Sequence, residues 1–205
     1  HPHHDPCHHL ALVHNGIIEN YLDIKRWLEE RSVFCVSDTD TEVVALLAHY
    51  LWDGDLLTTL QCVTKRIQGS YALALMHESK PDEIAVARKD SPLVIGEGEG
   101  EMFLSSDITA LLSYTRTFKL LEDNQIAIIK EEGASIYSVD GALVELESVI
   151  INWDAQSAEK SGYDHFMLKE MMEQPTVVQN TIGSRISQDK HSIMLDGNCL
   201  NPHYI

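Results

Sequence analysis

The chain has 205 residues, and its 15 Lys plus Arg against 32 Asp plus Glu give a formal net charge of −17. An acidic excess of this size repels nucleic acid and anionic lipid, because a phosphate-binding surface needs clustered cations. The hydrophobic fraction of 44% is enough for a folded core. No apolar run reaches the roughly 18 residues that a membrane span requires. Composition therefore excludes general nucleic-acid binding and membrane insertion as the main functions.

Four scattered cysteines, Cys7, Cys35, Cys62 and Cys199, form no C-x-x-C pair. This spacing argues against a zinc ribbon and against a disulfide scaffold. It fits a reducing compartment, so we expect a cytoplasmic protein.

The first residues predict a short strand that ends in a turn. Residues 10–13 are apolar, and His14-Asn15-Gly16 follows them. An Asn-Gly pair tolerates positive φ, so the strand should turn there. Apolar residues at helical spacing then predict a helix over residues 20–30, followed by a short strand over residues 33–36.

Two further helices have clear start signals. Thr39 and Glu42 have the capping-box spacing, which predicts a helix that begins there and reaches Trp52. Asp55 is a suitable cap for a third helix, whose apolar stripe continues to Ile67.

The middle of the chain consists of short apolar segments separated by Pro or Gly. These predict strands over residues 71–76, 84–87, 93–95, 102–105, 118–121, 125–129, 135–139 and 143–146. A brief helix should follow Asp107, and Asp140-Gly141 predicts a hairpin. Helices followed by many strands indicate an α+β layered domain. Beyond about residue 152 the sequence becomes polar and then helix-rich, which predicts a linker and the start of a second domain.

The histidine-rich first segment is a candidate metal site. Five of the 11 histidines lie in the first nine residues, together with Asp5 and Cys7. These side chains could ligate a transition metal. A solvated, flexible end is the alternative that we favour, because Pro2 and Pro6 oppose regular helical spacing. We therefore assign no metal ligand.

Two other short segments could carry chemistry. The Asn15 amide and the Gly16 N–H could aim two donors at one developing oxyanion, as acyl-transfer sites do. Asp40 could bind a substrate ammonium group. Each segment also has a plain structural interpretation, the first as a turn and the second as an acidic helix N-terminus.

In combination, these segments resemble a known family. His14-Asn15-Gly16-Ile17-Ile18-Glu19-Asn20, Thr39-Asp40-Thr41-Glu42, Ser91-Pro92-Leu93-Val94-Ile95-Gly96 and Lys169-Glu170-Met171-Met172-Glu173-Gln174-Pro175 occur in this order. The chain closely resembles the glutamine–fructose-6-phosphate aminotransferase (isomerising) family, from His1 to about Ser187. The first two segments are common to class II glutamine amidotransferases. The last marks the family's junction with a sugar-phosphate isomerase half.

The resemblance implies a fold and a domain organisation. The fold would be an incomplete four-layer αββα sandwich of the N-terminal nucleophile hydrolases. Residues 1–153 would form a partial glutaminase domain, residues 154–164 a linker, and residues 165–205 the helical start of the isomerase domain.

The resemblance also implies an activity and site residues. The parent enzyme would transfer the amide nitrogen of glutamine to fructose 6-phosphate, giving glucosamine 6-phosphate and glutamate without a cofactor. It would form a homodimer through its isomerase half, with no nucleic-acid or membrane partner. Asn15 and Gly16 would form the oxyanion hole, and Asp40 would bind the α-amino group of glutamine.

Three alternatives remain open at this point. Amidophosphoribosyltransferases and asparagine synthetases share the glutaminase chemistry, although the Glu173-Gln174-Pro175 junction argues against both. The third alternative is a non-catalytic module that binds glutamine or a metal through Asp40 or the histidines.

We predict that the 205-residue chain by itself has no glutaminase activity. The family's nucleophile is an N-terminal cysteine whose free α-amine, with a pKa near 8, serves as the base. Residue 1 is His, and Cys7 is internal, so its backbone nitrogen is an amide. The family's R-W-A-T-H-G loop, which clamps the substrate carboxylate, is also absent from this sequence. Ammonia release from glutamine above background, measured on the purified chain, would contradict the prediction.

Overall fold

The computed structural model describes residues 1–152 and 162–183. The chain divides into two compact units, His1–Trp153 and Asp154–Ile205. Most of the predicted linker over residues 154–164 lies outside the described residues, as does the predicted isomerase segment beyond residue 183.

The helices of the first unit confirm the predicted start signals. They are α1 (Tyr21–Glu29), α2 (Asp40–Tyr50), α3 (Leu56–Thr64) and the 3₁₀ helix η1 (Ile108–Leu111). The Thr39 hydroxyl accepts a hydrogen bond from the Glu42 N–H at 3.3 Å, and the Asp55 carboxylate accepts one from the Thr58 N–H at 2.8 Å. Both contacts satisfy N–H groups that would otherwise have no partner within the helix.

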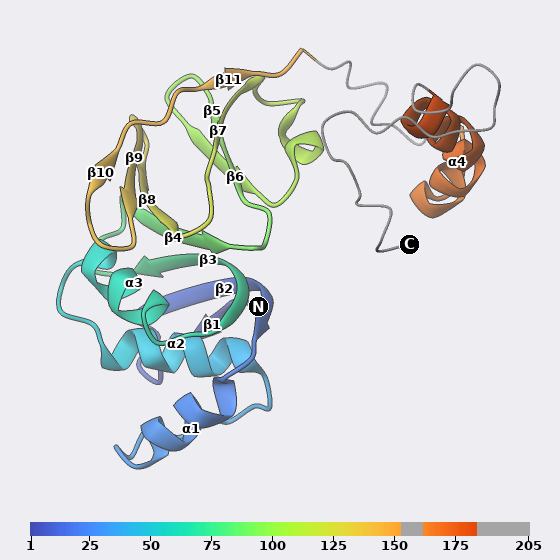
Figure 1. The fold of residues 1–205 in the computed structure, drawn as a ribbon. Helices are drawn as coiled ribbons and strands as arrows, with labels where there is room; N and C mark the ends of the chain where they lie inside the picture. Colours follow the sequence, from blue (N-terminus) through green and yellow to red (C-terminus); the bar gives the residue numbers. More distant parts are fainter. Residues whose placement is uncertain (153–161, 184–205) are drawn as a thin grey trace, which may run out of the picture. The chain divides into compact units, whose positions relative to one another are not determined.

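The strands form two sheets (Figure 1). The seven-stranded sheet has the order β1 (His3–His4), β2 (Leu10–Ile18), β3 (Gly69–His77), β4 (Ile84–Lys89), β8 (Gln125–Lys130), β9 (Gly133–Ser138) and β10 (Leu143–Val144). The four-stranded sheet has the order β11 (Val149–Ile150), β7 (Thr117–Leu120), β5 (Val94–Glu97) and β6 (Met102–Ser105). Neighbouring strands are antiparallel in both sheets.

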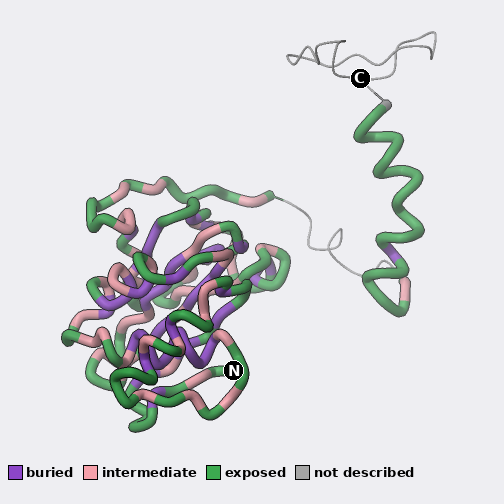
Figure 2. Tube along the Cα trace, turned by 60° about the horizontal axis from the view of Figure 1, so that its bottom comes forward, coloured by how far each residue is buried: buried purple, intermediate pink, exposed green. Residues whose placement is uncertain are grey.

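The inner strands β3, β4 and β8 of the seven-stranded sheet are buried on both faces, because each face belongs to a different core. On β3, Leu73 and Leu75 pack with the helices, whereas Ala72 and Ala74 pack against residues of the four-stranded sheet. Figure 2 shows the buried residues concentrated in these inner strands and in the helix beside them. Such alternation is expected of a sheet that lies between two layers.

The first unit therefore has an α+β layered architecture, which confirms the predicted fold class. Helices, the seven-stranded sheet and the four-stranded sheet form three successive layers. On the outer face of the four-stranded sheet, Leu111 of η1 lies beside Gly96 of β5. Among residues 1–152, η1 is the one helical segment on the outer face of the four-stranded sheet.

The described part of the second unit is one helix. It is α4 (Phe166–Gly183), which contains Pro175 and exposes most of its residues (Figure 2). Among the helices that the structure describes, none is both long and apolar enough to cross a membrane.

The predicted strand over residues 33–36 is wrong, because these residues form an irregular loop. The Glu42 carboxylate accepts hydrogen bonds from the Val36 N–H at 2.9 Å and the Ser37 N–H at 2.7 Å, and another from the Ser37 hydroxyl. A side chain of α2 thus satisfies backbone donors that a strand would present to a neighbouring strand. Val36 is 95% exposed, so its apolar character does not indicate burial.

Glu42→Gln should destabilise the domain at neutral pH. Burial raises the pKa of Glu42, whereas hydrogen bonds from the Ser37 hydroxyl and the two N–H donors, together with nearby His3, lower it. The lowering is the larger effect, so the pKa of Glu42 lies below its ordinary value of 4.5. A depressed carboxylate pKa contributes stability above the unfolded value, and this is lost as the pH falls through the folded value. The variant should lose at least about 1.5 kcal/mol at pH 7. It should approach the native chain in stability as the pH falls below the ordinary Glu pKa of 4.5 and through the lower pKa of the folded state.

Urea unfolding at several pH values measures this difference. Glu131→Gln is the control, because Glu131 is exposed at the turn between β8 and β9. Equal stability of Glu42→Gln and the native chain at pH 7 would contradict the prediction.

Candidate active site

Asn15 and Gly16 lie within a continuous strand, so the predicted turn is wrong. Strand β2 pairs with β3 over its full length, with Asn15 opposite Ala72 and Gly16 opposite Tyr71. Gly16 has φ +140°, and a Cβ built on it would lie 2.1 Å from the Ser70 carbonyl oxygen. Glycine is required here by the close approach of a neighbouring backbone, which a turn signal in the sequence does not distinguish.

The side chains of β2 alternate between the two layers. His14 is buried on the face that packs against α2, where its Nδ1 lies 3.1 Å from the Thr41 hydroxyl. Asn15 points to the opposite face. It lines a pocket of about 230 Å³ together with Leu104, Ser105 and Ser106. The Asn15 amide is therefore accessible from the space between the two sheets.

The backbone of β2 presents a donor beside Asp40. The His14 carbonyl oxygen lies 2.7 Å from His1 Nε2, and the Ile18 N–H donates to Asp40 Oδ2 at 2.9 Å. Both groups are on the edge of β2 away from β3. Because backbone groups alternate in direction along a strand, the Gly16 N–H lies on this same edge, between them.

Asp40 is placed by the N-terminus of α2. It is the first residue of that helix, where the helix dipole favours a negative charge. Its bond to Ile18 holds the carboxylate only two residues along β2 from Gly16. The structure thus brings the predicted amino-group ligand to the edge that carries one predicted oxyanion donor.

These groups have complementary chemistry. An amide NH₂ and a backbone N–H can stabilise an oxygen that becomes negative, and a carboxylate can bind an ammonium group. The arrangement suits a substrate that carries a carbonyl and an ammonium group a few bonds apart.

His14 and Thr41 are site residues that the sequence analysis did not select. The sequence signal that could have identified His14 is its position as a polar residue on the apolar face of β2. On that face it is buried together with Leu10, Leu12 and Ile18. A buried polar side chain needs a partner, and Thr41 supplies one for the Nδ1 atom of His14.

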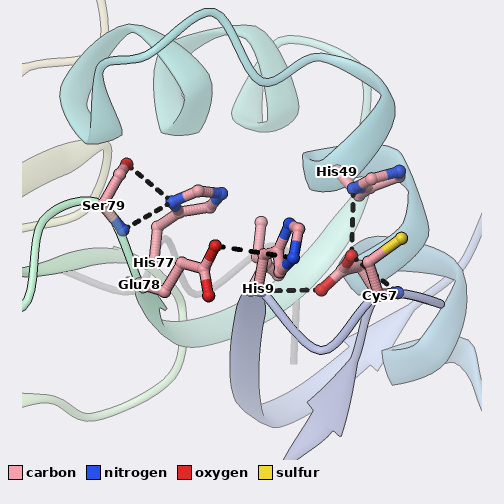
Figure 3. A network of polar contacts seen from close by, with 8 residues as sticks. Cys7, His9, His49, His77, Glu78 and Ser79 are labelled. Atoms are coloured by element: carbon pink, nitrogen blue, oxygen red, sulfur yellow. Dashed lines mark hydrogen bonds and ion pairs between the residues drawn. The ribbon is translucent and has the colours of Figure 1, made fainter.

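The histidine-rich segment is solvated as predicted, since most of residues 1–9 are exposed, but it is bonded to the domain at Asp5. Asp5 is 2% exposed and accepts hydrogen bonds from the Cys7 N–H at 3.0 Å and the Leu10 N–H at 2.6 Å. His49 of α2 lies 3.3 Å from the same carboxylate (Figure 3). Burial raises the pKa of Asp5, but these donors and His49 outweigh it and lower the pKa.

The neighbouring imidazoles are also engaged by protein groups. His9 lies 3.4 Å from Glu78, and His77 lies 2.8 Å from the Ser79 hydroxyl (Figure 3). His77 also stacks on Trp52 with ring centroids 3.8 Å apart. In the described part of the chain, no group of three or more His, Cys, Asp or Glu side chains is arranged to hold a metal ion.

Comparison with known proteins identifies sequences and a structure that are similar to this chain. The sequence pattern of the glutamine amidotransferase domain family matches residues 1–113. The glutamine–fructose-6-phosphate aminotransferase (isomerizing) of Caldanaerobacter subterraneus subsp. tengcongensis is 45% identical over 95% of this chain. The protein of the same name from Thermus thermophilus is 44% identical over the whole chain. The chain spans only 32% and 34% of these relatives, about a third of their length.

A solved structure supports the same relationship at the level of the fold. Glutamine phosphoribosylpyrophosphate amidotransferase from B. subtilis superimposes with a TM-score of 0.55 and 28% identity. The match covers 63% of this chain and 29% of that chain.

Gly16→Ala should strongly destabilise the domain, because the new Cβ would collide with a backbone carbonyl in the centre of the sheet. We expect a loss of more than about 2 kcal/mol. Gly133→Ala is the matched control, since Gly133 has φ +151° but no atom within 4 Å of the built Cβ. Urea unfolding compares the two. Equal losses for both variants would show that φ alone, and not the contact with Ser70, requires glycine at residue 16.

Proposed function

The chain belongs to the glutamine amidotransferase domain family, and on that premise we propose that it is the glutamine-hydrolysing part of a glutamine–fructose-6-phosphate aminotransferase. Relatives with that name are 40–45% identical over 91–100% of this chain. The phosphoribosylpyrophosphate amidotransferase is less similar, at 28% identity over 63% of the chain. This difference favours fructose 6-phosphate as the acceptor. The parent enzyme would convert fructose 6-phosphate and glutamine to glucosamine 6-phosphate and glutamate.

The proposal is carried by one observation, the position of Asp40 at the N-terminus of α2, where it is bonded to β2, the strand that holds Asn15 and Gly16. Asp40 Oδ2 accepts the Ile18 N–H at 2.9 Å. A glutamine whose α-ammonium binds Asp40 could direct its side-chain carbonyl toward the Gly16 N–H and the Asn15 amide. The strand would then orient both ends of the substrate.

The chemistry follows from these roles. A cysteine thiolate from outside these 205 residues, as the family resemblance implies, would attack the amide carbon of glutamine. The electrons of the carbonyl bond would move to its oxygen, where Asn15 and Gly16 stabilise the charge. Collapse of this intermediate would break the carbon–nitrogen bond and release ammonia, with a proton supplied to the leaving nitrogen. Water would then hydrolyse the glutamyl thioester to glutamate.

The proposal extends to the whole parent protein. Residues 1–153 would belong to the four-layer αββα sandwich of the N-terminal nucleophile hydrolases. Residues 165–205, including α4, would begin the isomerase domain, through which the enzyme would form a homodimer. The Lys169–Pro175 segment supports this assignment by its resemblance to the family's domain junction.

Substitution of the two kinds of site residue in the full-length protein should affect different kinetic constants. Asn15→Ala should lower kcat for glutamine hydrolysis about 100- to 1,000-fold, because an oxyanion donor acts in the transition state. Asp40→Asn should raise the KM for glutamine at least about 10-fold, because it removes the charge that binds the ammonium group. Ammonia release at varied glutamine concentration measures both constants.

Asp38→Asn is the matched control, since Asp38 is exposed and lies two residues before Asp40. It should leave both constants unchanged. Glutamine binding without turnover in the full-length native protein would favour the non-catalytic module. Glutamine hydrolysis stimulated by phosphoribosyl pyrophosphate and not by fructose 6-phosphate would favour the amidophosphoribosyltransferase alternative.

A further inference from the structure

A second polar contact joins β2 to α2, on the face of the strand opposite Asn15. His14 Nδ1 lies 3.1 Å from the hydroxyl of Thr41, the residue that follows Asp40. His14 is 8% exposed and Thr41 is 4% exposed. The helix N-terminus is therefore bonded to β2 at two places, His14 and Ile18, and the Asn15–Gly16 pair lies between them.

Much of the remaining contact between the two elements is apolar. Leu12 and Ile18 of β2 share one core cluster with Val44 and Leu47 of α2. Hydrophobic contact is non-directional, so it holds the helix against the sheet without fixing its exact position along the strand. Hydrogen bonds have narrow distance and angle limits and can fix that position.

The His14 imidazole is suited to a fixed structural contact. Burial lowers the pKa of His14, and the negative charge of Asp40 opposes this only in part. The neutral ring can donate or accept at Nδ1, and a threonine hydroxyl can serve as its partner in either case. Side-chain alternation places the ring on the face of β2 opposite the Asn15 side chain.

We propose that His14 and Thr41 are positioning residues that set the distance between the oxyanion donors on β2 and the ammonium ligand Asp40 on α2. This inference rests on the proposed glutaminase function. If the contact is lost, glutamine can still bind through its ammonium group, but its amide carbonyl is no longer aligned with Asn15 and Gly16. Misalignment of this kind lowers kcat and leaves ground-state binding largely intact.

Thr41→Val in the full-length protein removes the hydroxyl and keeps the shape of the side chain. We expect kcat for glutamine hydrolysis to fall about 10-fold or more, with the KM for glutamine changed less than about 3-fold. Thr41→Ser keeps the hydroxyl and should restore most of the kcat. Thr59→Val is the matched control, because Thr59 is also fully buried and donates to the Asp55 carbonyl at 2.7 Å in α3.

Thermal unfolding of each variant separates positioning from stability. A purely structural role predicts that Thr41→Val and Thr59→Val lower the melting temperature and leave kcat unchanged in the folded enzyme. Either that result or a failure of Thr41→Ser to restore kcat would overturn the inference. In both cases, glutamine hydrolysis by the native full-length protein would still support the proposed function. Absence of glutamine hydrolysis in the native full-length protein would overturn both.

Discussion

The pairing of β2 with β3 is the constraint on which the rest of the first unit depends. It runs without interruption from Leu10 opposite His77 to Ile18 opposite Gly69. Through it, one face of β2 meets α2 and the other face borders the space between the two sheets. The Asn15–Gly16 pair is held in the middle of this ladder, so backbone pairing sets the direction of the Gly16 N–H. Under the proposed function, a donor preorganised in this way needs no rearrangement as charge develops on the substrate.

Local sequence signals predicted most of the helices and strands, because periodicity and caps act over a few residues. Thr39 and Asp55 cap the helices that they were expected to cap. The same local signals failed where a distant group decides the structure. An Asn-Gly pair looks alike in a turn and in a strand, and the deciding contact here is the carbonyl of Ser70 on another strand. The apolar residues 33–36 form a loop, whose end is held by the bond from the Val36 N–H to the distant Glu42 carboxylate.

The division into two sheets could be expected from the family resemblance but not from the strand patterns, since a strand buried on both faces shows no polar alternation. On β3, the helix-facing Leu73 and the inward-facing Ala72 are equally apolar. The candidate site was predicted in part. Asn15, Gly16 and Asp40 stood out by residue type and by family resemblance, but the position of Asp40 beside β2 depends on the Asp40–Ile18 contact. The His14–Thr41 contact joins residues 27 positions apart, and neither residue forms a local motif with the other.

Different constraints act on residues 15 and 16, and this difference matters when members of this family are compared. Gly16 is demanded by a backbone carbonyl, which no side-chain substitution elsewhere can remove. A descendant that had lost glutamine hydrolysis would still need glycine at that position in order to fold. Asn15 has an exposed side chain, so the fold places far less demand on it. Under the proposed function, the asparagine and not the glycine would therefore distinguish active domains from those that keep the fold alone in a sequence survey.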